Sequence, residues 1–184
     1  MGKIWVPGLC EGIGADESNR GRNPEIHVGI FTNDWRDLID YGFEKFDPIK
    51  GRKAGIGLSP ILRKRGWAFL LIDRVKLLEM HYYQRLGNLL GSLALGESFG
   101  RELKIYVDGN YSLRSITYAG GILAKISGIE REKVKVISGP KMDRRVFATA
   151  LADRTASWLY SQRLSYLEEH PNRKKLRRKF RGNS

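Results

Sequence analysis

The sequence contains a single cysteine, Cys10, among its 184 residues. One thiol cannot form an internal disulfide, so the fold has to be stabilised by a hydrophobic core. Histidine is almost as scarce, because only His27, His81 and His170 are present, and their spacing is not that of metal ligands. These absences argue against a disulfide-rich secreted scaffold and against a zinc enzyme.

Long apolar runs are also missing. No run approaches the ~18 residues that a membrane helix requires, and the mean hydropathy is −0.40. Residues 1–10 include Lys3 but no apolar block followed by a cleavage site, so we expect no signal peptide. The sequence therefore predicts a cytoplasmic protein without a membrane partner.

Acidic residues are few beside basic ones, and the net charge is +13 with a pI of about 10.0. Such an excess favours a polyanionic partner, because each neutralised phosphate releases counterions. The excess gathers in two segments without acids, one between Asp47 and Asp73 and one after Glu169. A solvated loop and a solubilising tail are the alternative interpretation. The basic residues predicted to contact nucleic acid are Lys50, Arg52, Lys53, Arg63, Lys64, Arg65, Arg173, Lys174, Lys175, Arg177, Arg178 and Lys179.

Hydrophobic periodicity predicts alternating strands and helices. The predicted strands cover residues 12–17, 25–31, 66–72, 103–108 and 133–138. Apolar residues at helical spacing between Val75 and Leu93 predict a helix, and further helices are expected at 112–126 and 142–168. The segment 48–65 is rich in glycine and proline and is expected to be an exposed loop.

This order of elements is typical of an α/β domain. Three strands come first, and a strand–helix–strand–helix series follows them. We expect one domain over residues 1–170, followed by a basic tail over 171–184.

The informative acids stand at strand ends. Asp16 and Glu17 end the first predicted strand, and Asp108 ends the fourth. The carboxyl ends of parallel strands gather at one edge of a sheet, where ligands bind. Clustered carboxylates are costly unless cations neutralise them, and oxygen ligands without Cys or His suit Mg²⁺ or Mn²⁺. An acidic centre in a basic protein fits two-metal cleavage of a phosphodiester.

Three segments resemble type 2 ribonuclease H (ribonuclease HII). Residues 14–21, G-A-D-E-S-N-R-G, are similar to the G-I-D-E-A-G-R-G signature of that family, and residues 107–110 match its V-D-G-N. Asp143 precedes a helix of small residues, as the fourth acid of the family does. The resemblance covers about residues 12–160.

The resemblance implies a ribonuclease H-like fold, with a mixed five-stranded sheet flanked by helices. It also implies a metal-dependent endonuclease that cleaves RNA in RNA–DNA hybrids by a two-metal mechanism. Carried over by position, the metal-binding and catalytic residues are Asp16, Glu17, Asp108 and Asp143. The residues expected to contact the scissile strand are Ser18, Asn19, Arg20 and Gly21.

The sequence departs from the family in three places. Ser18 and Asn19 replace Ala-Gly where the family's backbone approaches the ribose 2′-hydroxyl. Residues 152–156 read A-D-R-T-A instead of the family's A-K-V-T-R-D continuation, and no H-K-G-Y-G-T segment is present. A nuclease with a different substrate, or a non-catalytic RNA- or DNA-binding protein that retains the fold, therefore stays open.

Each singled-out residue also has a structural interpretation. Asp16, Glu17 and Asp108 suit turns at strand ends, and Asp143 suits the start of a helix. Glu79 could replace a ligand but fits a solvated helix face better, and Asp153 could support a ligand or lie at the surface. The tyrosines that could stack on bases, although core positions are favoured for them, are Tyr106, Tyr111 and Tyr118.

We predict that deletion of residues 172–184 weakens nucleic-acid binding and flattens its dependence on salt, because each lost phosphate contact removes released counterions. Binding titrations at several salt concentrations would measure both effects, and a thermal melt would show that the fold is kept. Unchanged binding by the truncated protein would contradict this role of the tail.

Overall fold

A computed structural model of the chain describes residues 10–18, 25–42, 54–62, 65–72, 80–94 and 99–161. Five strands form one sheet in the order β3-β2-β1-β4-β5. They are β1 (Cys10–Ser18), β2 (Glu25–Thr32), β3 (Gly66–Ile72), β4 (Phe99–Asp108) and β5 (Val134–Gly139). All five predicted strands are confirmed, although β4 begins at Phe99 and not at residue 103.

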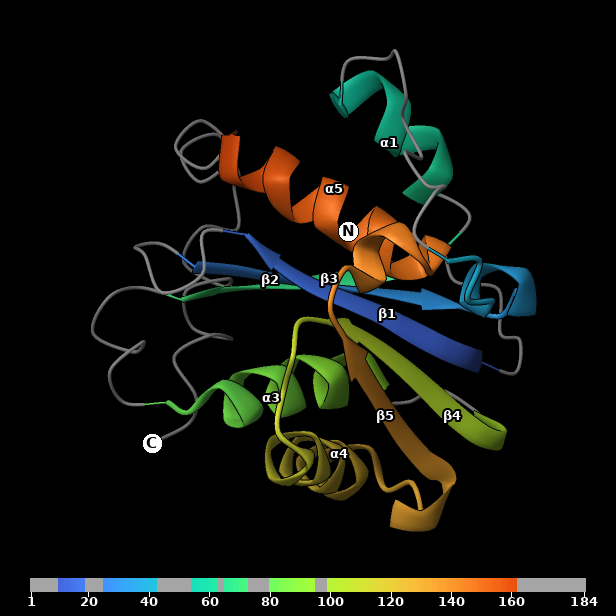
Figure 1. Cartoon of the computed structure of the whole chain (residues 1–184), viewed down its shortest axis with the longest axis vertical. Helices are drawn as coiled ribbons and strands as arrows, with labels where there is room; N and C mark the ends of the chain where they lie inside the picture. The colour runs from blue at the N-terminus through green and yellow to red at the C-terminus, as the bar shows by residue number, and fades with distance from the viewer. Residues whose placement is uncertain are drawn as a thin grey trace.

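The sheet is mixed, as expected. β1 pairs with β2, and β2 with β3, in antiparallel fashion, whereas β1–β4 and β4–β5 are parallel. The helices are α1 (Ala54–Leu62), α3 (Tyr82–Ala94), α4 (Leu113–Ser127) and α5 (Phe147–Ser161). Figure 1 shows α3 and α4 on one face of the sheet and α1 and α5 on the other. Short 3₁₀ turns are η1 (Trp35–Leu38), η2 (Arg131–Lys133) and η3 (Met142–Arg144).

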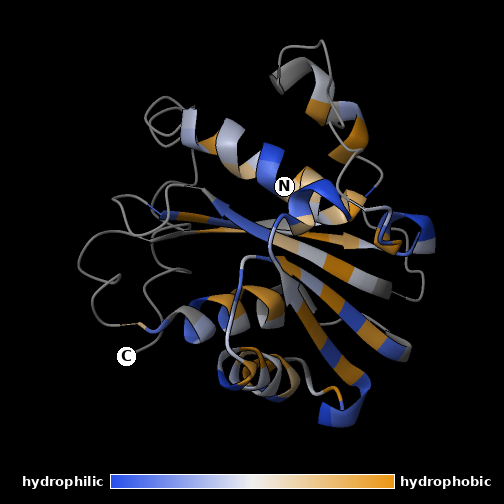
Figure 2. Ribbon diagram, in the orientation of Figure 1, coloured by the Kyte–Doolittle hydropathy of each residue, from blue (hydrophilic) through white to orange (hydrophobic). Residues whose placement is uncertain are grey.

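Local sequence explains the parallel half of the sheet. Hydrophobic and polar residues alternate along β4 and β5, as the bands in Figure 2 show, and Leu103, Ile105 and Val107 of β4 are fully buried. Ser112 caps α4 by accepting the backbone N–H of Ser115, and Gly128 ends the helix with φ +73°.

Two hydrophobic layers cover the sheet. One lies under α3 and α4 and includes Ile13, Leu90, Ile105 and Leu123. The other lies under α1 and α5 and includes Val28, Leu58 and Leu151. Within the described ranges, no helix is both long and apolar enough to span a bilayer.

Three sequence predictions need correction. The segment 48–65 is not wholly an exposed loop, because 54–62 forms α1 and buries Leu58 and Leu62. The helix expected to run from Val75 includes neither Met80 nor His81, and α3 begins at Tyr82. The long helix expected from Met142 is a 3₁₀ turn followed by α5, and residues beyond 161 lie outside the described part of the chain.

Gly14 brings β1 against the backbone of α5. A Cβ atom at Gly14 would lie 2.6 Å from the carbonyl oxygen of Ala148, and closer still to the Ala148 carbon and the Thr149 nitrogen. Since these are backbone atoms of a helix, they cannot move aside as the end of a flexible side chain can. The contact sets the distance between α5 and the sheet.

We predict that Gly14→Ala lowers the free energy of unfolding by at least ~2 kcal/mol, because α5 must shift to make room. Denaturant unfolding would measure the loss. Gly121→Ala is the matched control: a Cβ there meets nothing within 4 Å, so the variant should be up to about 1 kcal/mol more stable through helix propensity. Equal stability of the two variants would contradict this role of Gly14.

Candidate metal and nucleic-acid site

Asp16 lies two residues before the end of β1, and Asp108 ends the neighbouring parallel strand β4. The register pairs Gly14 with Tyr106 and Ala15 with Val107, so Asp16 and Asp108 occupy the next positions. Side chains alternate between the faces of a sheet, and Gly14 and Tyr106 both pack toward the start of α5. The two carboxylates therefore share the α5 face at the carboxyl edge of the sheet.

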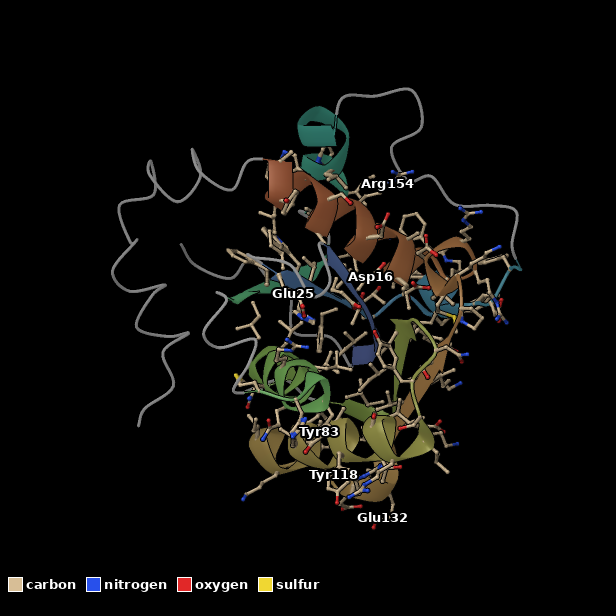
Figure 3. The ribbon with its side chains drawn as sticks, turned by 60° about the vertical axis from the view of Figure 1, so that its left-hand side comes forward. Asp16, Glu25, Tyr83, Tyr118, Glu132 and Arg154 are labelled. Atoms are coloured by element: carbon tan, nitrogen blue, oxygen red, sulfur yellow. The ribbon has the colours of Figure 1, made fainter. Side chains whose placement is uncertain are left out.

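Asp16 is the most deeply buried of the predicted acids. Its side chain lies beneath α5 (Figure 3), and the residue is 8% exposed. Burial raises the pKa of Asp16 well above its usual value, and the negative charges of Glu17, Asp108 and Asp153 raise that pKa further. A hydrogen bond of 2.7 Å from the backbone N–H of Glu17 to Oδ1 opposes the shift. Asp16 thus lies within reach of three other carboxylates.

Asp108 connects the end of β4 to η3. Its Oδ1 accepts the backbone N–H of Met142 at 2.5 Å and lies 3.4 Å from that of Asp143. Burial and the charge of Asp108 raise the pKa of Asp143, while the cations Arg144 and Arg154 lower it. Three of the four predicted acids, from β1, β4 and η3, therefore gather along one edge of the sheet.

Glu17 faces the opposite layer, because it follows Asp16 along β1. It pairs in register with His27 of β2, and its Oε1 accepts the hydroxyl of Tyr111 at 3.0 Å. The chain returns Tyr111 to this position by turning at Gly109, whose φ is +110°. A Cβ at Gly109 would also lie 2.8 Å from the Tyr111 ring. The loop after Asp108 therefore orients Glu17.

A buried ionic pair lies on the same face as Glu17. His27 Nε2 contacts Oε1 of Glu25, and Nη1 of Arg85 lies 3.5 Å from that oxygen. Glu25 and His27 are 0% and 1% exposed, and Figure 3 shows Glu25 near the sheet edge above α3. This group joins β2 to α3 in the layer behind Glu17. Sequence reasoning did not identify it, because a strand alone does not reveal which helix supplies the balancing cation.

Asp153 on α5 completes the acidic group. The sequence left its role open, and the structure brings its charge close enough to raise the pKa of Asp16. A signal was present in the spacing: Asp153 follows the buried Thr149 by one helical turn, and Thr149 Oγ1 lies 3.4 Å from the carbonyl oxygen of Tyr106. The side of α5 that covers Gly14 therefore also carries Asp153 toward Asp16.

The chemistry of this group suits a hard divalent cation. All donors are carboxylate oxygens, and burial, with the negative charges of Glu17, Asp108 and Asp153, raises the pKa of Asp16. Among the residues that the structure describes, however, no three His, Cys, Asp or Glu side chains are arranged to surround one ion. The residues thus fit a metal by donor type and charge, without a preformed cage.

Most of the predicted nucleic-acid contacts lie outside the described ranges. Ser18 ends β1, and Arg65 precedes β3. The predicted contacts that fall outside are Asn19, Arg20, Gly21, Lys50, Arg52, Lys53, Arg63, Lys64, Arg173, Lys174, Lys175, Arg177, Arg178 and Lys179, as does the alternative ligand Glu79.

Arg65 has a different place from the one expected. Its Nε and Nη2 donate to Oδ2 and Oδ1 of the buried Asp37 at 2.7 and 2.8 Å, and its guanidinium lies 5.1 Å from the centroid of the Phe147 ring. Thr32 Oγ1 also donates to Asp37 at 2.8 Å. A guanidinium held in this way joins η1, β3 and α5, so a phosphate contact by Arg65 does not fit the geometry.

We predict that Asp16→Asn stabilises the metal-free protein at neutral pH. The folded-state pKa of Asp16 is raised, so its contribution to stability is complete below the unfolded pKa of about 4 and is lost as pH rises through the folded value. Denaturant unfolding from pH 4 to 8 should show a decline for the wild type and a flatter profile for Asp16→Asn.

Asp34→Asn provides the control of opposite sign. Hydrogen bonding to Arg36 lowers the pKa of Asp34, so its stabilising effect is present at neutral pH and lost as pH falls. Asp34→Asn should therefore be less stable than the wild type at pH 7. If Asp16→Asn were also less stable than the wild type at pH 7, the conclusion that burial and neighbouring charges destabilise the Asp16 carboxylate would be wrong.

Comparison with known proteins adds evidence on the fold. No protein-family model and no curated protein matches the sequence. Among solved structures, the ribonuclease HII of Archaeoglobus fulgidus in complex with PCNA superposes with a TM-score of 0.57 at 14% identity, covering 92% of this chain and 88% of that one. Ribonuclease H2 of Pyrococcus horikoshii gives 0.54 at 16% identity, covering 94% and 99%.

A single-residue variant of Bst-RNase HIII gives a TM-score of 0.55 at 17% identity, covering 88% of this chain and 55% of that one. Identities this low carry information on architecture and not on residue roles. The strand order, the mixed pairing and these superpositions agree with one another. The chain has a ribonuclease H-type fold.

Proposed function

We propose that this protein is a divalent-metal-dependent endonuclease that hydrolyses phosphodiester bonds, with RNA in RNA–DNA hybrids as its substrate. The observation that carries the proposal is the acidic group at the carboxyl edge of β1 and β4, in which Asp16 is buried among three other carboxylates. The net charge of +13 around such a group favours a polyanion as the ligand.

The residues proposed to hold Mg²⁺ or Mn²⁺ are Asp16, Glu17, Asp108 and Asp143. A cation bound there lowers the pKa of a coordinated water and neutralises charge on the leaving oxygen. Asp153 adds negative charge near Asp16 from α5, and the Tyr111 hydroxyl restricts the carboxylate of Glu17. The backbone hydrogen bond from Met142 holds Asp108 at the edge of the sheet.

The proposed substrate is inferred from the similarity of this chain to ribonucleases H in structure and in motifs. The superposed structures are named ribonuclease HII, H2 and HIII, and residues 14–21 and 107–110 resemble the ribonuclease HII motifs. We propose that Ser18, Asn19, Arg20 and Gly21 contact the scissile strand. The basic residues of segments 50–64 and 173–179 would then bind the phosphates on either side. The proposed partner is nucleic acid, and the proposed location is the cytoplasm.

A second candidate is a non-catalytic nucleic-acid-binding protein with the same fold. The observation in its favour is that the described carboxylates do not form a group of three around a common point. The side chains of Ser18 and Asn19, where the family has Ala-Gly, also favour it.

The deciding experiment incubates labelled RNA–DNA hybrid, duplex DNA and structured RNA with the protein and Mg²⁺ or Mn²⁺. We expect cleavage of the hybrid, and a loss of at least about a hundredfold in Asp108→Asn, because that change removes a ligand charge. Asn keeps the side-chain oxygen that accepts the Met142 N–H, so the fold should survive. Asp34→Asn, an acid paired with Arg36 elsewhere, should cleave as the wild type does.

Thermal unfolding with and without Mn²⁺ separates the two candidates. A metal site stabilises the folded state on binding, and this stabilisation should vanish in Asp16→Asn and persist in Asp34→Asn. If no substrate is cleaved and Mn²⁺ does not change the melting temperature, the function is that of a non-catalytic nucleic-acid-binding protein.

A further inference from the structure

A row of stacked planar groups crosses from α3 to α4, on the face of the sheet opposite α5. The ring of His81 stacks on Tyr83 at a centroid distance of 5.4 Å and 11° between planes, and Tyr83 stacks on Tyr118 at 5.1 Å and 29°. The guanidinium of Arg114 lies 5.7 Å from the Tyr118 centroid. We call these four residues the stacking row.

The stacking row is fixed at its base and open at its surface. Tyr83 is partly buried and packs against the core under α3 and α4, whereas Tyr118 is 48% exposed. Figure 3 shows both tyrosines where α3 meets α4, away from Asp16. A large aromatic face that stays in water is costly to maintain, and an anchored ring is a rigid platform for another planar group.

A surface hollow of about 360 Å³ adjoins Tyr118 along α4. Its lining residues are Thr117, Tyr118, Gly121, Ile122, Lys125 and Arg131. A Cβ at Gly121 would meet nothing within 4 Å, and Arg131 is held by donating from Nη1 to the carbonyl of Val134 at 2.8 Å. The hollow thus combines an aromatic wall, an open floor and two cations.

The charge around this surface favours an anion. The helices α3 (Tyr82–Ala94) and α4 (Leu113–Ser127) contain no Asp or Glu, and α4 carries the exposed cations Arg114 and Lys125. Of the two acids in the adjoining turn, Glu130 pairs with Lys133 at 3.0 Å, and Glu132 is exposed. The cations Arg114, Lys125 and Arg131 therefore outnumber Glu132. Planar faces with cations beside them are what the bases and phosphates of a single strand require.

The α4 half of the stacking row follows the loop after Asp108 closely in the chain. α4 begins at Leu113, just after the loop that leaves Asp108 and sends Tyr111 to Glu17. At 1.5 Å per residue, Tyr118 lies only about 8 Å along α4 from Leu113. Tyr118 therefore lies within two helical turns of the end of that loop, in the helix layer on the opposite face of the sheet from Asp16 and Asp108.

We propose that the stacking row and the hollow beside it form a binding site for unpaired bases of a single-stranded nucleic-acid segment. This inference rests on the proposed function: it gives the nuclease a substrate whose single-stranded segment reaches the layer of α3 and α4. The binding itself requires no metal ion, so it can be tested apart from cleavage.

The test titrates the full chain, in EDTA, into a fluorescent oligothymidine of about 12 nucleotides, within the usual site size for single strands. Anisotropy should show roughly tenfold weaker binding by Tyr118→Ala, and near wild-type binding by Tyr118→Trp. Tyr41→Ala is the matched control, because Tyr41 is a 43% exposed tyrosine on another surface. Gly121→Leu places a side chain in the hollow at a position where a Cβ meets nothing within 4 Å, and it should also weaken binding.

An abasic oligomer of equal length separates stacking from phosphate contact. It should bind the wild type less tightly than oligothymidine and should bind Tyr118→Ala about as tightly as the wild type. Equal binding of both oligomers by the wild type, or equal affinities of Tyr118→Ala and Tyr41→Ala, would overturn the inference. Because EDTA removes metals, a failure to cleave any substrate would refute the proposed nuclease and leave this result intact.

Discussion

The contact of backbone against backbone at Gly14 is the constraint on which the acidic edge depends. With no side chain between them, β1 and the start of α5 lie at the shortest separation that the main chains allow. That separation brings Asp153 within electrostatic reach of Asp16. A wider gap between β1 and α5 would separate Asp16 from Asp153, and each carboxylate could then be solvated or paired independently.

The same closeness has an electrostatic cost that the fold offsets locally. Asp16 is buried with a raised pKa, and its neighbours repel it. The backbone N–H groups of Glu17 and Met142 each donate to a carboxylate, of Asp16 and of Asp108. These bonds hold the acids in place but do not neutralise them.

The five strands could be predicted from sequence because each is a short run whose alternation or apolar character is local. Asp16, Glu17 and Asp108 were equally visible, since each stands at the end of a predicted strand, whereas Asp143 was found from the family resemblance. Contacts between distant segments were not: Tyr111 meets Glu17 across 94 residues, and Arg65 pairs with Asp37. α1 was missed because the glycines around Pro60 resemble a loop, while burial of Leu58 under α5 outweighs their low helix propensity.

The alternation of side chains along β1 has a consequence for the order of events in folding. Asp16 turns to the layer of α5 and Glu17 to the layer of α3 and α4, although the two are adjacent in the chain. Neither layer alone supplies the surroundings of both carboxylates. A chain that has docked only one set of helices therefore has the surroundings of only one of these two carboxylates in place, so the ion affinity proposed above should arise late in folding, once the sheet is covered on both sides.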